Sequence, residues 1–130
     1  ANFKRFIQFE PDDAVAYSNL GQVLYETGNV TEAITNYNRA IQLNPDDPVV
    51  YNNLGIALSR QGNSSQAIAT LNRAIGINPN YALAYYNRGN AYYRQSRWNA
   101  AIADYERALQ IDPNFQNARD NLQNARRRAR

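Results

Sequence analysis

Apolar residues recur along the chain at the three- and four-residue spacing that puts them on one face of a helix. The stretch 48–79 contains two such stripes, one formed by Val50, Tyr51, Leu54 and Leu58, the other by Ala67, Ile68, Leu71, Ala74 and Ile75. A short polar segment, 61–63, separates them. Pro79 ends the second stripe, because the residue before a proline is disfavoured in the α conformation. The stretch therefore predicts two helices joined by a tight turn.

The turn between these helices carries its own signals. Gly62 can take the left-handed conformation that ends a helix, which only Gly adopts at low cost. Asn63 is then placed as the N-cap of the second helix, with Gln66 three residues later to complete a capping box. Asn29 and Glu32 repeat this pair of residue types one period earlier. We therefore predict the same capped turn at both places.

The whole arrangement recurs with a period of 34 residues. Prolines fall at 11, 45, 79 and 113, and the same spacing is kept by Gly21, Gly55, Gly89, Ala33, Ala67 and Ala101. Such a period indicates a repeat protein, in which each unit buries its apolar face against its neighbours. We expect a single domain with three full repeats, at 14–45, 48–79 and 82–113. The second helix of an incomplete earlier repeat is expected at 1–11, and a capping helix at 114–130.

The residues that mark one period are Tyr51, Leu54, Gly55, Leu58, Ala67, Leu71, Ala74 and Pro79. This pattern resembles the tetratricopeptide repeat, and the repeats at 14–45 and 82–113 resemble it too, although Arg88 stands where a Leu is usual. The resemblance implies an all-α fold, a right-handed superhelical stack of helix-turn-helix units. It also implies a protein-interaction scaffold, whose first helices line a concave groove for an extended peptide or partner segment.

The resemblance places one set of side chains in this groove: Asn19, Gln22, Asn53, Ile56, Arg60, Tyr86, Asn87, Asn90, Tyr93 and Arg94. Three of them, Asn19, Asn53 and Asn87, share one repeat position, and an amide carries both a donor and an acceptor for a peptide backbone. The row is similar to the asparagine ladder in the repeat domain of O-linked N-acetylglucosamine transferases. The alternative is that Asn is simply common at this position. Asn52 and Ser59 are expected on the same face.

Repeat three is expected to hold the strongest part of the groove. Tyr86, Tyr93 and Arg94 belong to the residue types that contribute most to binding energy. The alternative is that the two tyrosines pack against the capping helix. The charge along the groove changes from negative at Glu26 in repeat one to positive at Arg60 and Arg94 in the later repeats. A bound peptide is therefore expected to place its acidic end near Arg94.

A second branch of the same family binds the C-terminal carboxylates of chaperones through a clamp of Lys, Asn and Arg. The basic places of that clamp hold Ser18, Leu83 and Asn87 in this chain, and only Asn53 matches. The sequence therefore disfavours binding to chaperone tails.

Composition excludes several other classes of function. The chain has no His and no Cys, which removes most zinc sites, the usual catalytic triads and the commonest general base. The carboxylate pairs at 12–13 and 46–47 recur just before a helix and are interpreted as caps. We predict no enzyme activity, no metal and no cofactor. The sequence contains no membrane span and no leader, which leaves the compartment open and favours the cytoplasm.

Positive charge gathers at the C-terminus. Residues 119–130 hold five Arg and one Asp, a net charge of +4, so the other residues together carry −1 of the total of +3. One interpretation is a solvated helix end favoured by the helix dipole, and the other is contact with nucleic acid or with an acidic membrane surface. Nucleic acid is disfavoured as the main partner, because basic residues elsewhere are dispersed among acids.

The segment 1–11 contains four large apolar residues, Phe3, Phe6, Ile7 and Phe9, on more than one side of a short helix. They are expected to leave an open edge, and such an edge tends to self-associate weakly. The segment is interpreted as the start of a piece of a longer protein, with a natural short cap helix as the alternative.

Overall fold

The computed structural model describes residues 13–130. The described chain forms seven α-helices: α2 (Ala14–Glu26), α3 (Val30–Leu43), α4 (Pro48–Arg60), α5 (Ser64–Ile77), α6 (Ala82–Arg94), α7 (Trp98–Ile111) and α8 (Gln116–Arg128). The helix predicted at 1–11, and the association predicted through its apolar residues, lie outside the described residues.

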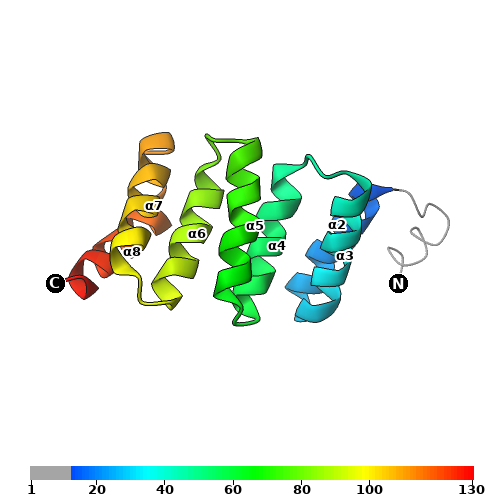
Figure 1. Ribbon diagram of the computed structural model, residues 1–130, viewed down its shortest axis with the longest axis horizontal. Coiled ribbons are helices and arrows are strands. Elements are labelled where there is room, and N and C mark those ends of the chain that lie inside the picture. The colour runs from blue at the N-terminus through cyan, green and yellow to red at the C-terminus, as the bar shows by residue number, and fades with distance from the viewer. Residues whose placement is uncertain (1–12) are drawn as a thin grey trace.

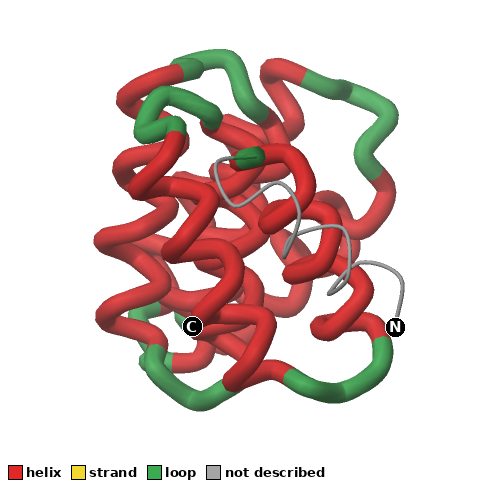
Figure 2. The backbone as a smooth tube through the Cα atoms, turned by 90° about the vertical axis from the view of Figure 1, so that its right-hand side faces the viewer, coloured by secondary structure: helices red, strands yellow, loops and turns green. Residues whose placement is uncertain are grey.

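The helices pack in the order of the chain. Three hairpins, α2–α3, α4–α5 and α6–α7, form the stack, and α8 packs on α7 (Figure 1). The second helix of each hairpin contacts the first helix of the next, and α4 also contacts both α2 and α6. Seen along the stack, the loops gather at the two ends of the helices (Figure 2). The predicted all-α stack of helical hairpins is confirmed.

Small residues set how closely the two helices of a hairpin approach. A Cβ atom built on Gly55 would lie 2.6 Å from Cγ of Leu71 on α5. The same close approach joins Gly89 to the Tyr105 ring, at 2.8 Å. A contact below about 3 Å cannot be accommodated in a close-packed interior without a shift. Gly55 and Gly89 are therefore points of close approach between the two helices of their hairpins.

The apolar faces of the helices meet in an interior made of three buried clusters. Its largest fully buried side chains are Tyr37, Leu71 and Tyr105, one from the second helix of each hairpin. On α8, the buried residues are Ala118, Leu122 and Ala125, and the last two pack in one cluster with Tyr105. The outward side of α8 stays exposed, so this helix covers the last hairpin.

The predicted turns differ in detail. Gly62 has φ of 93° and Asn63 accepts a hydrogen bond from the Gln66 backbone N–H, at 3.4 Å, so the predicted N-cap forms. Oε1 of Gln66 accepts from the Asn63 side-chain amide, at 2.6 Å, and not from its backbone N–H, so the predicted capping box is only half formed. The capping box predicted at Asn29 is wrong, because Asn29 makes no side-chain cap. Its amide instead donates to the Thr27 hydroxyl, at 3.2 Å, which turns it away from the helix.

None of the helices within 13–130 is long and apolar enough to cross a membrane.

Candidate functional site

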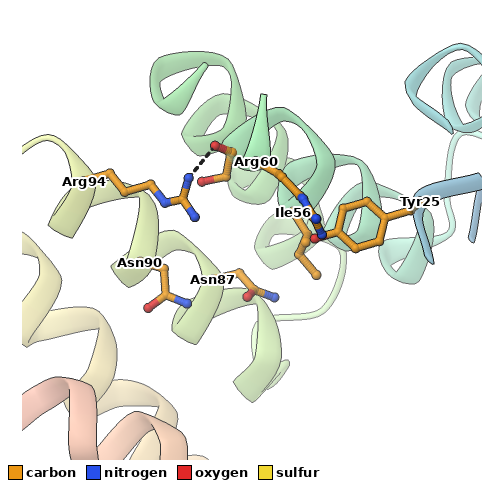
Figure 3. Close-up of a pocket in the computed structure, with 7 residues that line it drawn as sticks. Tyr25, Ile56, Arg60, Asn87, Asn90 and Arg94 are labelled. Carbon is orange, nitrogen blue, oxygen red and sulfur yellow. Dashed lines mark hydrogen bonds between the residues drawn. The ribbon is translucent and has the colours of Figure 1, made fainter. Parts of the chain in front are cut away.

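The first helices of the hairpins carry a hollow of about 300 Å³ between α2, α4 and α6. The residues that line it are Tyr25, Ile56, Ser59, Arg60, Asn87, Asn90 and Arg94. Figure 3 shows Asn87, Asn90 and Arg94 on α6 facing Ile56 and Arg60 on α4, with Tyr25 beyond them. We call this hollow the α4–α6 subsite.

A second hollow, of about 270 Å³, continues toward the C-terminus. Its lining residues are Asn90, Tyr93, Arg94, Tyr105, Asn121 and Asn124. Because Asn90 and Arg94 line both hollows, the two form one row across α2, α4, α6 and α8. We call this row the groove, and the second hollow the α6–α8 subsite.

Hydrogen bonds between helices fix how the Asn87 amide is turned. Its Nδ2 donates to Oδ1 of Asn52 on α4, at 3.0 Å. Asn52 is only 2% exposed, so the expectation that it faces the groove is wrong. It lies between the helices and orients Asn87. Oδ1 of Asn87 accepts no hydrogen bond from the described residues and remains an acceptor for a ligand.

The Asn90 amide is turned in the opposite sense. Its Oδ1 accepts hydrogen bonds from the Tyr105 hydroxyl, at 2.6 Å, and from Nδ2 of Asn121, at 3.0 Å. Burial raises the pKa of Tyr105 above its ordinary value, so the phenol keeps its proton and stays a donor. With Oδ1 occupied, Asn90 offers its N–H groups. Asn87 and Asn90 therefore present one acceptor and one donor side by side.

Two guanidinium groups border the α4–α6 subsite. Nη1 of Arg94 donates to the Ser59 backbone carbonyl, at 2.7 Å, and this holds the end of α6 against α4. Arg60 lies over the Tyr25 ring, with Cζ 5.3 Å from the centroid. Neither guanidinium forms an ion pair with a carboxylate of residues 13–130. This part of the groove is therefore positively charged.

The two tyrosines of repeat three have partly structural roles. The Tyr86 ring lies 4.7 Å from the Phe115 ring at the start of α8 and 6.0 Å from the Tyr105 ring. Tyr86 lines neither hollow, and its ring contacts favour the alternative that it packs against α8. Tyr93 packs edge-on against Trp98, at 4.9 Å, and also lines the α6–α8 subsite.

Besides Tyr86, three more of the expected groove residues lie outside both hollows. Asn19 is exposed on α2 and Asn53 is half-buried on α4, and neither has a hydrogen-bond partner among the described residues. Gln22 donates to Glu26 one turn later, at 3.3 Å. The asparagine ladder thus reaches a hollow through Asn87 alone of its three predicted members.

Sequence reasoning missed the contribution of α8 and of Tyr105. Asn121 and Asn124 stand 34 residues after Asn87 and Asn90, and the same period that located the repeats could have located them. They were overlooked because α8 was interpreted only as a cap. Tyr105 belongs to a second helix and reaches the groove through its hydroxyl, which the period does not reveal.

The C-terminal arginines fold back onto neighbouring groups. Arg126 pairs with Glu106 on α7, at 3.0 Å, and Arg128 lies over the Trp98 ring, with Cζ 5.7 Å from the centroid. Arg127 donates to Asn124. These contacts favour the solvated-helix interpretation over a nucleic-acid site. Within residues 13–130 there is also no group of three or more potential metal ligands.

The order of helices and the row of hollows define a helical-repeat interaction domain. Family profiles described as TPR repeat match residues 21–62 and 59–96, and profiles described as tetratricopeptide repeat match 2–35 and 82–115. The chain belongs to the tetratricopeptide repeat (TPR) family, and it is a TPR protein-interaction domain. A search of curated proteins gave no significant match.

Solved TPR domains share the fold at modest identity. The first TPR domain of human RPAP3 has a TM-score of 0.88 at 28% identity, covering 89% of this chain and 91% of that one. The first TPR of Spaghetti (RPAP3), bound to the HSP90 peptide SRMEEVD, has a TM-score of 0.86 at 29% identity, covering 88% and 90%. MamA has a TM-score of 0.89 at 28% identity, covering 95% of this chain and 72% of its own.

Proposed function

We propose that this domain binds an extended segment of a partner protein in the groove and performs no chemistry itself. The observation that carries the proposal is the opposite orientation of two neighbouring amides. Asn87 offers an acceptor and Asn90 offers donors into the same hollow. An extended peptide exposes both N–H and C=O groups along its backbone, so this pair fits one peptide unit whatever its side chain.

Charge and apolar surface give the bound segment a direction. Arg60 and Arg94 lie at the C-terminal ends of α4 and α6, and Glu26 lies at the end of α2. An acidic part of the segment therefore lies near Arg94. Aliphatic side chains of the segment pack over Ile56 and over Val49, which is 48% exposed.

A related domain supports this use of the fold, with different ligand chemistry. The Spaghetti domain holds the peptide SRMEEVD, which ends in acidic residues. At the places of the chaperone clamp, this chain has the uncharged residues Ser18, Leu83 and Asn87. We infer that the two domains share the peptide-binding groove and that this chain does not take chaperone tails as its partner.

The test is a selection of random twelve-residue peptides on the immobilised domain, followed by titration of one selected peptide into ¹⁵N-labelled protein. Backbone and side-chain amide signals of Asn87, Asn90 and Asn121 are expected to shift most. Signals of the exposed faces of α3 and α5 are expected to stay in place.

Two variants sharpen the result. Asn90→Leu removes the donor in the groove, and Asn38→Leu changes an exposed Asn on α3. The first is expected to weaken the selected peptide at least tenfold and the second less than twofold. Peptides that bind equally well to both variants, or that shift only α3 and α5 signals, would rule the groove out.

A further inference from the structure

The α4–α6 subsite has a lining that is unusually rich in donors. Arg60 and Arg94 both reach it, and no acidic residue is among the described residues that line it. Arg94 donates one N–H to the Ser59 backbone carbonyl, at 2.7 Å, and its other N–H groups have no partner in the described chain. Figure 3 shows the two arginines on either side of the hollow.

A buried hydroxyl in the same hollow lacks a partner. Ser59 is 8% exposed, and its Oγ is the one buried side-chain oxygen or nitrogen among the described residues that makes no hydrogen bond. Buried polar groups in native proteins are nearly always paired, so an unpaired one calls for an explanation. The Oγ atom has almost no accessible surface, so a rotation about χ1 would have to bring it toward a ligand oxygen in the hollow, which would then provide the missing partner.

Asn90 adds a fourth donor. Because the Tyr105 hydroxyl and Asn121 occupy its Oδ1, the Nδ2 group is the part of the amide that remains for a ligand. The subsite therefore offers four donor groups, from Ser59, Arg60, Asn90 and Arg94. A carboxylate has two oxygens with about four lone-pair sites, which matches this number.

The net charge of the α4–α6 subsite favours a ligand group with a single negative charge. The ends of α4 and α6 at this hollow each carry roughly half a negative charge from the helix dipole, against two positive guanidinium groups. The remaining charge is about +1, which one carboxylate neutralises and a doubly charged phosphate exceeds. Arginines that only offset the helix dipole would explain the charge but leave the Ser59 hydroxyl unpaired.

We propose that the α4–α6 subsite binds one carboxylate of the partner segment between Arg60 and Arg94, with hydrogen bonds from Ser59 and Asn90. The proposal rests on the proposed function. The carboxylate comes from an Asp or Glu side chain or from the end of the segment. The four residues that hold it differ from the clamp places Ser18, Leu83 and Asn87, but Asn87 lines the same hollow, so the carboxylate site lies next to the position of the chaperone clamp.

The probes are four pools of nine-residue peptides whose variable positions contain only uncharged residues. The first three pools are amidated and carry Glu, Gln or phosphoserine at the centre. The fourth carries Gln and a free C-terminal carboxylate. Affinities are measured by fluorescence anisotropy for the native domain, for Ser59→Ala, for Arg60→Gln/Arg94→Gln and for the control Arg39→Gln/Arg73→Gln. The control removes the same charge from α3 and α5, where each arginine also lies over a tyrosine.

We expect the Glu pool or the free-carboxylate pool to bind at least tenfold more tightly than the amidated Gln pool, and the tighter of the two identifies the source. Arg60→Gln/Arg94→Gln should abolish this preference, Ser59→Ala should reduce it several-fold, and the control should keep it. The carboxylate subsite would be overturned by any of three results. The first is equal binding of the charged and uncharged pools, and the second is a preference that survives Arg60→Gln/Arg94→Gln. The third is binding of the phosphoserine pool that is tenfold tighter than binding of the Glu pool. If all pools bind equally and the groove variants weaken them all, the proposed function stands and only the carboxylate subsite is contradicted. If no pool binds, both the proposed function and the carboxylate subsite are contradicted.

Discussion

The hairpins α4–α5 and α6–α7 have the same backbone plan but hold it together differently. In α4–α5, Leu54 is buried in the apolar core. At the same position 34 residues later stands Arg88, whose guanidinium makes two hydrogen bonds to the Asp104 carboxylate, at 2.7 and 2.9 Å. Asp104 takes the place of Thr70 and is only 4% exposed. One hairpin thus has an apolar contact where the next has a buried ion pair.

The ion pair changes the stability of the hairpin in a way that the apolar contact does not. Burial raises the pKa of Asp104 above its ordinary value, although the hydrogen bonds and charge of Arg88 act in the opposite direction. Moving two charges out of water has a large unfavourable free energy, and the attraction between the charges offsets it only when their geometry is good. Arg88 also donates to Asn72 on α5, at 2.9 Å, and so ties α6–α7 to the preceding hairpin. The comparison teaches that a repeat can replace an apolar contact with ions if both partners are present.

The largest effect is expected from breaking this pair on one side. Arg88→Leu leaves the Asp104 carboxylate buried without its partner, which typically costs about 3–5 kcal/mol in the free energy of unfolding. The loss should shrink as the pH falls toward the pKa of Asp104, because a raised pKa means that the folded state prefers the protonated carboxyl. Urea unfolding at pH 7 and at pH 4 measures both quantities.

The double variant Arg88→Leu/Asp104→Thr gives the third hairpin the residues of the second. It is expected to recover to within about 1 kcal/mol of the native protein, because neither partner is then a charge left buried without its counter-ion. A double variant as unstable as Arg88→Leu alone would show that the two hairpins are not interchangeable at this position.

A smaller effect is expected from the close approaches of the helices. Gly55→Ala and Gly89→Ala each place a Cβ within 3 Å of a buried side chain, Leu71 in one hairpin and Tyr105 in the other. Overpacking of this kind costs typically 1–3 kcal/mol. Gly76 is the control, since a Cβ there meets no atom within 4 Å, and Gly76→Ala should instead stabilise α5 by about 1 kcal/mol. The midpoint of thermal unfolding is measured for the three variants. A shift in the same direction for all three would contradict this prediction.

The smallest effect concerns the turns of the two hairpins. Gly62 has a positive φ of 93°, and Ser96 has one of 60° at the equivalent turn. A left-handed conformation is strained by roughly 1–2 kcal/mol for residues with a Cβ. Ser96→Gly is therefore expected to stabilise the domain by about 1 kcal/mol, and Gly62→Ser to destabilise it by a similar amount, in chemical unfolding. Ser96→Gly with lower stability than the native protein would contradict this account.

The helices and their order could be predicted from the sequence because the 34-residue period repeats the same physical signals. Glycines such as Gly55 mark close approaches, prolines such as Pro79 mark helix ends, and apolar stripes mark buried faces. The failure at Asn29 came from a competing local partner, the Thr27 hydroxyl, which the capping pattern does not take into account.

The site was predictable only in part, because side-chain orientation depends on neighbours in the next hairpin. Asn19 and Asn87 occupy the same repeat position, yet only Asn87 lines a hollow. Its amide is turned by Asn52, a residue that the sequence placed in the groove and the structure buries. Arg88 was visible as a departure from the pattern, but its pairing with Asp104 follows from the packing of α6 on α7 and not from the period.

The central claim is that the domain binds its partner segment through the groove, and one comparison tests it most directly. The affinity of a peptide selected on the native domain is measured by calorimetric titration against Arg94→Ala and Arg73→Ala. Arg94 borders both hollows, whereas Arg73 lies over Tyr51 on an exposed face of α5. Arg94→Ala is expected to weaken binding roughly 30-fold, because a central binding residue contributes on the order of 2 kcal/mol. Arg73→Ala is expected to change the affinity less than twofold, and equal affinities for the two folded variants would contradict the account.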